Sequence, residues 1–284
     1  MNIYDRKKRC LVEELEHQDK FVQFLYNRVT GRVLLKICLV RPWLSKAVAV
    51  YQKSRFSKRD IIPFIQKHNI DTTHWDVNNF KSFNDFFIRK KKLSVSDDPK
   101  DLTSIAESKL SVYNIDEDLC LDIKNSKYTV EEIVGNKELA EQYSDGLCLV
   151  FRLSANNYHR YLFPDNGKLK KTYKIKGTLH TVRPVAAKYK VFSRNSREVS
   201  ILETENLGKI VQVEVGAMLV GKIRNHAVTK FIKGDEKGYF EYGGSTSILF
   251  LNNNVEIDGD IIEQTKKGYE VKVDIGEKIG RICS

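Results

Sequence analysis

The sequence predicts an α+β fold, in which a helical N-terminal region precedes a mostly antiparallel β domain. Apolar residues recur at helical spacing near the start, at Leu11, Leu15, Phe21, Phe24 and Leu25. From residue 102 onward, short β-type runs alternate with turn residues. Between the two lies LSVSDDPKD (93–101), whose small and acidic residues and Pro99 are typical of a linker. We therefore expect a helical region over 1–100 and a β-rich catalytic domain over 101–284.

Further along the first region, we expect a helix over Lys58–His68 with Ser57 as its N-cap. Val33–Tyr51 is apolar, but three basic residues and Pro42 interrupt it, so it is too charged and too broken to cross a membrane. Its aliphatic residues and Trp43 beside Lys and Arg suit either a membrane-interface segment or an ordinary helix pair on the core. An aromatic segment with a basic end follows at Phe80–Lys92.

In the second region, Asp165-Asn166-Gly167, Asn206-Leu207-Gly208 and Asp258-Gly259 predict turns between strands. One helical insertion is expected over Thr129–Tyr143. The expected strands lie within the runs KLSVYNI (109–115), LCLVFRL (147–153), YKIKGTLHTV (173–182), REVSILET (197–204), KIVQVEVGAMLVGKI (209–223), GYFEYGGSTSILFL (238–251) and YEVKVDIG (269–276).

The composition limits the partners. The 284 residues carry a net charge of +11, which favours an anionic partner such as nucleic acid or an anionic membrane surface, although a solvated basic face is equally compatible. The chain has no recognised nucleic-acid motif, so we do not expect nucleic acid as a partner. Five cysteines without a CxxC pair indicate a reducing compartment without structural disulfides.

Several common chemistries lack support in the sequence. It contains no GxGxxG, no GxxxxGK[ST], no HExxH and no GxSxG, and its six histidines lack metal-ligand spacing, so we expect no metal site. The unusual feature is the Gly-Gly-Ser-Thr that interrupts the β-type run 238–251. A bulge or a tight turn explains such glycines in most strands.

Serine chemistry offers another explanation. The Ser245 hydroxyl can attack the carbonyl of Gly244, because glycine adds no side-chain hindrance and accepts unusual backbone angles. The resulting ester can eliminate to dehydroalanine, which hydrolyses to a pyruvoyl group. That carbonyl can form a Schiff base with an amine and accept the electrons released with CO2, without pyridoxal phosphate.

Four segments in order resemble the phosphatidylserine decarboxylase family, over nearly the whole chain. FKSFNDFFIRK (80–90) resembles the family's FNxFFxRK, and NYHRYLFPDNG (157–167) resembles DYHRxHxPxxG. VGAMLVG (215–221) is similar to VGAxxVG, and GGSTSILF (243–250) contains the GST self-cleavage motif. FIKGDEKGYF (231–240) has a similar family context.

The resemblance implies a proenzyme of the bacterial type that cuts itself between Gly244 and Ser245. The products are a large chain, 1–244, and a small chain, 245–284, which carries the covalent pyruvoyl cofactor derived from Ser245. The implied reaction converts phosphatidylserine to phosphatidylethanolamine and CO2. In the family, an Asp–His–Ser relay activates the serine.

The chain departs from that relay at two positions. Glu107, in IAESKL, stands where aspartate is usual, and Leu162 replaces the second histidine of YHRxH. Leucine cannot move protons, so another base takes over or processing is slow or absent. His159 is the first candidate and would also protonate the product carbanion. His180, in GTLHTV, is the second, although a strand histidine with an ordinary hydrogen bond is the simpler interpretation.

The remaining expectations concern substrate, partners and location. Arg160 and Arg183 are candidates to bind the substrate phosphate or carboxylate, since arginine offers a fork of donors. We expect the N-terminal region, with Trp43, the Phe83–Phe87 cluster and Lys90–Lys92, to rest on the cytoplasmic side of the cell membrane as a peripheral protein. A homodimer is left open. Two alternatives also stay open: a decarboxylase of small amino acids on the same scaffold, and a poorly processed, non-catalytic membrane-binding relative.

Overall fold

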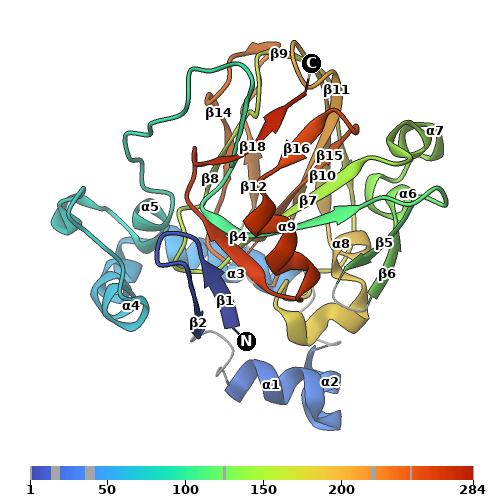
Figure 1. Cartoon of the computed structure of the whole chain (residues 1–284). Helices are drawn as coiled ribbons and strands as arrows, with labels where there is room; N and C mark the ends of the chain where they lie inside the picture. Colours follow the sequence, from blue (N-terminus) through green and yellow to red (C-terminus); the bar gives the residue numbers. More distant parts are fainter. Residues whose placement is uncertain are drawn as a thin grey trace.

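A ten-stranded sheet forms the centre of the computed structural model, which describes residues 2–13, 20–35, 42–123, 126–218, 222–243 and 245–283 (Figure 1). Neighbouring strands are antiparallel, except that β1 and β17 are parallel. From edge to edge the order is β13 (Lys230–Phe231), β9 (Gly167–Ile175), β10 (Arg197–Thr204), β11 (Lys209–Val215), β15 (Ser245–Leu251), β7 (Leu147–Leu153), β4 (Ser108–Asn114), β17 (Glu270–Val273), β1 (Asn2–Asp5) and β2 (Cys10–Glu13).

The central strands of the sheet are buried on both faces: alternate side chains of a strand point to opposite faces, and each face of these strands packs into an apolar core. In β15, Leu249 and Leu251 belong to one apolar core, while Ile248 and Phe250 belong to a second. This explains why β15 and β7 read as nearly continuous apolar runs rather than alternating ones. The strand that begins at Ser245 therefore lies deep in the protein, with every residue buried.

Three smaller sheets complete the β structure. One has the order β12 (Ile223–Asn225), β14 (Glu236–Phe240), β8 (Arg160–Leu162), and its Tyr161 and Phe240 pack into the first core. The others are β16 (Val255–Ile257), β18 (Lys278–Ile282), β3 (Asp101–Thr103), and the pair β5 (Cys120–Ile123), β6 (Ser126–Thr129).

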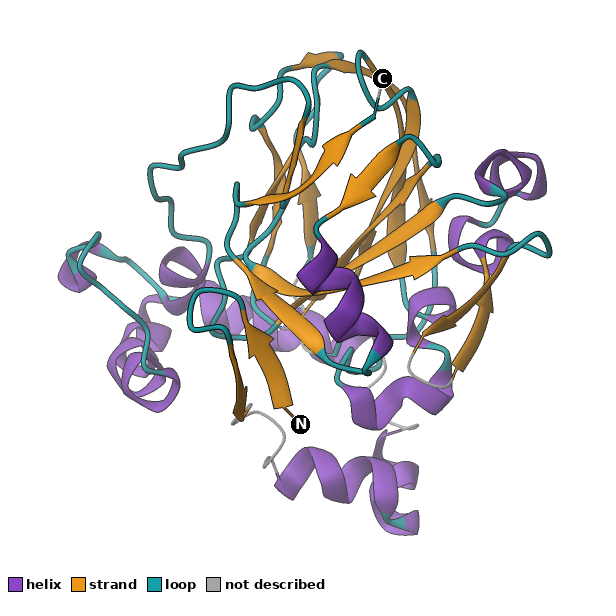
Figure 2. Cartoon of the chain, in the orientation of Figure 1, coloured by secondary structure: helices purple, strands orange, loops and turns teal. Residues whose placement is uncertain are grey.

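Most helices lie toward one end of the β structure (Figure 2). Helix α1 packs into the second core through Val22, Leu25 and Tyr26, whereas α4 and α5 share a separate aromatic cluster with Tyr242. The helices are α1 (Lys20–Asn27), α2 (Val29–Leu34), α3 (Pro42–Lys53), α4 (Ile61–His68), α5 (Phe83–Phe87), α6 (Val130–Val134), α7 (Lys137–Ala140), α8 (Val191–Arg194) and α9 (Gly259–Lys266), with the 3-10 turns η3 (Arg55–Asp60), η4 (Val77–Asn79), η5 (Glu141–Tyr143) and η6 (Pro184–Tyr189).

The α+β class is confirmed, and several predicted elements appear at the expected places. Strands β7 and β10 have the predicted bounds. The insertion over 129–143 forms α6, α7 and η5, and Thr129 caps α6 by exchanging hydrogen bonds with Glu132. The run 173–182 is only partly correct, because β9 ends at Ile175.

The prediction for the first residues is wrong. Leu11 lies in β2, and β1 and β2 form a hairpin at the sheet edge, because the short run in β1 pairs with β17 instead of forming a helix. Leu15 lies outside the described residues. Ser57 is not an N-cap: it is buried within η3, and its hydroxyl donates to Gln52 and Ser54 carbonyls.

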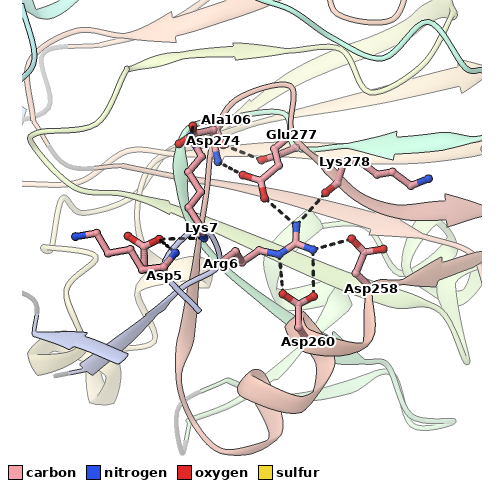
Figure 3. Close-up of polar contacts among 11 residues, drawn as sticks. Asp5, Arg6, Lys7, Ala106, Asp258, Asp260, Asp274, Glu277 and Lys278 are labelled. Atoms are coloured by element: carbon pink, nitrogen blue, oxygen red, sulfur yellow. Dashed lines mark hydrogen bonds and ion pairs between the residues drawn. The ribbon is translucent and has the colours of Figure 1, made fainter. Parts of the chain in front are cut away.

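The N-terminal hairpin is fastened to the C-terminal segment by Arg6 (Figure 3). Its guanidinium makes ion pairs with Asp258, Asp260 and Glu277 at 2.8–2.9 Å, and donates to the Lys278 carbonyl. Lys7 adds an exposed pair with Asp274. All five partners lie after residue 244, so the first residues of the chain are bound to its last forty.

Candidate active site

Ser245 is the first residue of β15 and lies between β11 and β7, with Leu153 opposite it. It is fully buried, and its Oγ has no hydrogen-bond partner among the described residues. Gly243, two residues earlier, has a φ of 125°, a value that L side chains rarely adopt. Gly244 lies outside the described residues. A buried, unpartnered hydroxyl after a conformationally unusual glycine suits a serine that reacts with its own backbone.

His159 lies at the same end of β15. Its Nε2 is 3.1 Å from the Ser154 carbonyl, next in the chain to the Leu153 that pairs with Ser245. Because a carbonyl only accepts, Nε2 carries the hydrogen, which leaves a lone pair on Nδ1. Nδ1 has no partner among the described residues, and the ring stacks on Phe87 with centroids 4.1 Å apart.

Burial, together with the nearby charges of Arg89 and Lys109, lowers the pKa of His159 to about 3. The imidazole is therefore neutral near pH 7, with its lone pair at Nδ1. The aromatic segment of the sequence fixes this ring, since Phe83 and Phe87 of α5 also contact Tyr242, just before the Gly-Gly-Ser.

Glu107 is connected to the His159 loop through Asn157. Asn157 donates from Nδ2 to Glu107 Oε1 at 3.2 Å and accepts from the Ser154 amide at 2.8 Å. The other Glu107 oxygen pairs with Lys91 at 2.9 Å. The carboxylate thus orders the loop that carries His159, and Asn157 is a participant that sequence reasoning did not single out, although it lies in the motif NYHR.

Leu162 occupies the place of the second family histidine. Its amide donates to the Ile105 carbonyl at 2.9 Å, so its backbone adjoins the turn that carries Glu107. Its buried side chain packs with Tyr158 and Ile275 in an apolar cluster. The relay site of the family is therefore present in the backbone, but it is filled by an aliphatic side chain.

His180 has a different environment. Its Nδ1 is 3.2 Å from the Tyr26 hydroxyl, its ring stacks on Tyr189, and burial lowers its pKa to about 4. Asn195 connects it to the site, because its Nδ2 donates at 2.8 Å to the carbonyls of both His180 and Gly216, the residue after β11. His180 belongs to the loop after β9, not to a strand as predicted.

The two candidate arginines also differ. Arg160 donates to the Ile88 and Arg89 carbonyls, pairs with Glu236 at 2.5 Å and lies over the Tyr239 ring. These contacts fasten the end of α5 to β8 and β14. Arg183 is half-buried and lines a narrow cavity with Arg152 and Glu270. Substrate binding by either one stays a prediction.

Sequence reasoning missed Arg89, within the motif FFxRK. It is 5% exposed, and its Nε has no partner among the described residues. The guanidinium lies 5.0 Å from the Trp75 ring centre and 4.9 Å from that of Phe86. Its charge helps to lower the pKa of His159. A buried cation at this position signals an anion site more clearly than Arg160 does.

Comparison with known proteins decides the family. The family model described as phosphatidylserine decarboxylase matches residues 83–281. This chain belongs to the phosphatidylserine decarboxylase family. It is 46% identical over 285 residues to phosphatidylserine decarboxylase proenzyme 2 of Clostridium acetobutylicum, covering 99% of this chain and 98% of the relative. Proenzymes of Clostridium botulinum (39% identical, 98% of each chain) and Clostridium beijerinckii (36%, 99% and 98%) are similar over the same extent. The resemblance drawn from the four motifs is thereby confirmed.

Proposed function

We propose that this phosphatidylserine decarboxylase family member converts phosphatidylserine to phosphatidylethanolamine and CO2, with a pyruvoyl group that it makes from Ser245 by cutting the Gly244–Ser245 bond. The observation that carries the proposal is the buried Ser245 hydroxyl, without a partner among the described residues, at the start of a central strand. The pyruvoyl group supplies a carbonyl that binds the substrate amine and accepts the electron pair left when CO2 departs.

The surrounding residues suit that group. After the cut, position 245 would lie between β7 and β11, away from water, which favours loss of the charged carboxylate as neutral CO2. His159 lies beside this end of the strand, and its Nδ1 has no partner among the described residues, so it is the candidate to relay a proton to the product carbon. Arg89 offers a buried positive charge to the anionic headgroup.

The lipid requires access to a membrane. Among the described residues, nine of the ten exposed large apolar side chains belong to the first 62 residues: Leu11, Phe24, Val29, Val33, Leu34, Val50, Tyr51, Phe56 and Ile62. Exposed basic residues alternate with them, among them Arg28, Arg32 and Arg55. This combination suits peripheral docking on the anionic cytoplasmic face. No described helix is long and apolar enough to cross a bilayer.

The surface that docks differs from the predicted one in one respect. The Phe83–Phe87 cluster does not face the membrane: Phe83, Phe86 and Phe87 are at most 2% exposed, because they pack on His159, Tyr242 and α4. The Trp43 side chain lies outside what is described. The homodimer stays a prediction, which analytical ultracentrifugation checks.

The test measures both the self-cleavage of the chain and the conversion of the lipid. Intact mass of the purified 32.8 kDa chain should show two products that meet at 244/245, and the small one should have a blocked N-terminus. Mixed micelles of phosphatidylserine should yield phosphatidylethanolamine, whereas Ser245→Ala should yield neither cut nor product. Turnover of a free amino acid in place of the lipid would refute the substrate, and an intact wild-type chain would refute the pyruvoyl group.

A further inference from the structure

Four buried polar atoms without a partner lie on one face of two neighbouring strands. They are Ser245 Oγ and Ser247 Oγ of β15, and Gln212 Oε1 and Glu214 Oε1 of β11, all fully buried and without hydrogen bonds among the described residues. Buried polar atoms are nearly always satisfied, so a group of four requires an explanation. Apart from Ser245 itself, none of these residues belongs to the family's Asp–His–Ser relay as the motifs place it.

The strand register fixes their arrangement. Glu214 lies directly opposite Ser247, and Gln212 lies opposite Leu249. Ser245, two residues before Ser247, points to the same face and is the diagonal neighbour of Glu214. Diagonal neighbours are about 7–8 Å apart, within reach of a long side chain such as glutamate. The carboxylate is therefore the acidic group that β11 presents toward Ser245.

One oxygen of Glu214 is held in place and the other is available. Oε2 accepts from Lys237 Nζ at 2.7 Å and from Asn225 Nδ2 at 3.1 Å. Lys237 is 2% exposed, so this is a buried ion pair. Oε1 has no donor, and a serine hydroxyl can rotate to provide one. Burial raises the pKa of Glu214 above its ordinary value although Lys237 opposes the shift, which makes the carboxylate a better base.

We infer that Glu214 is the base that activates Ser245 for self-cleavage in this chain, in place of the histidine that Leu162 replaces. The inference rests on the proposed cut at Gly244–Ser245 and adds the group that drives it. It uses a side chain on the strand beside the serine, whereas the family relay would reach the serine from the turn at Glu107 and from β8.

The step balances without a further reactant. Glu214 Oε1 takes the Ser245 hydroxyl proton as Oγ bonds to the Gly244 carbonyl carbon. The carbon–nitrogen bond between Gly244 and Ser245 then breaks, and the nitrogen receives the proton back from Glu214. The product is an ester between Gly244 and the Ser245 oxygen, and the carboxylate returns to its starting state.

Glu214→Gln tests the inference, with Glu198→Gln as the matched control. Glu198 lies opposite Glu214 on β10, is also buried and also binds Asn225, but it is one strand farther from Ser245. In cell-free synthesis followed by intact mass, we expect Glu214→Gln to slow the cut by at least about 100-fold. Glu198→Gln should stay within about threefold of the wild type. A folded Glu214→Gln chain that cuts at the wild-type rate would overturn the inference.

Two further measurements separate activation from folding. Glu214→Gln leaves Lys237 as a buried unpaired charge, so the double variant Glu214→Gln/Lys237→Met restores neutrality and should fold and remain uncut. Its cutting at the wild-type rate would equally overturn the inference. Hydroxylamine cleaves an ester more readily than an amide. If ester formation is blocked in both Glu214 variants, hydroxylamine should not release the small chain from either one. Release of the small chain would show that the ester had formed, and it would refute the role of Glu214 as the base. An uncut wild type would instead refute the proposed function.

Discussion

A histidine that stays neutral inside the protein should make the fold sensitive to acid, and the size of the effect follows from its burial. The pKa of His159 is about 3 in the folded chain and 6.5 ordinarily. Between those values the unfolded chain binds a proton that the folded chain does not, so stability falls as the pH falls. From pH 7.5 to pH 5 the loss is about 2 kcal/mol, at 1.36 kcal/mol per pH unit below 6.5.

The assay compares two pH profiles of unfolding free energy, measured by urea titration in a Ser245→Ala background so that each sample is one chain. His159→Gln keeps a donor for the Ser154 carbonyl but cannot titrate, so its profile should be flatter by about 2 kcal/mol between pH 7.5 and pH 5. His74→Gln, at an exposed position, is the control for the loss of a histidine side chain. Parallel profiles for the wild type and His159→Gln would show that the ring is not held neutral and would refute its assignment as a free base.

Three other predictions concern stability, substrate and membrane. Glu270→Ala should lower the free energy of unfolding by about 3–5 kcal/mol, because Arg152 and Glu270 form a buried ion pair at 2.5 Å with each side chain 3% exposed. Glu203→Ala, in the exposed pair with Lys170, should lower it by under about 1 kcal/mol. Equal losses for the two variants in urea titrations would contradict this. Arg89→Lys should raise KM for phosphatidylserine about tenfold with little change in kcat or in self-cleavage, because lysine lacks the forked donors of arginine. An unchanged KM would exclude Arg89 from headgroup binding. Val50→Glu/Phe56→Glu should weaken binding to anionic vesicles by at least about tenfold in a flotation assay, whereas Ile232→Glu, at an exposed apolar position outside the N-terminal region, should not. Equal binding by both variants would argue against docking through the N-terminal helices.

The pattern of neighbouring residues predicted those elements whose structure depends mainly on their own short segment of sequence. β7 and β10 are apolar runs between turn signals, and the helical turns after Thr129 begin with a capping box that can be read from Thr129 and Glu132. The hairpin of β1 and β2 could not be predicted in this way, because its partner β17 lies more than 260 residues later. Pairing over such a distance leaves no signal in a short window of sequence.

The residues of the candidate site also divide into those that a motif identifies and those that only the folded structure identifies. Ser245 and His159 could be named because each lies within a distinctive motif, and the structure brings both to one end of β15. Arg89 lay within a motif as well, but only burial distinguishes it from the many surface arginines. Glu214 was hidden in an alternating strand, where a glutamate normally faces water; the second layer of β12, β14 and β8 covers that face and makes it interior.

The attachment of Arg6 to the last forty residues has a consequence for the order of events during synthesis. β15 cannot pair with β11 and β7 until residue 251 has left the ribosome, and β1 cannot pair with β17 until residue 273 has done so. A serine that reacts only when it is held in the finished sheet therefore cannot react while β15 is still inside the ribosome. After the proposed cut, the new fragment would still be paired on both sides and bound to the amino terminus of the other chain, so the two products would stay together as one molecule.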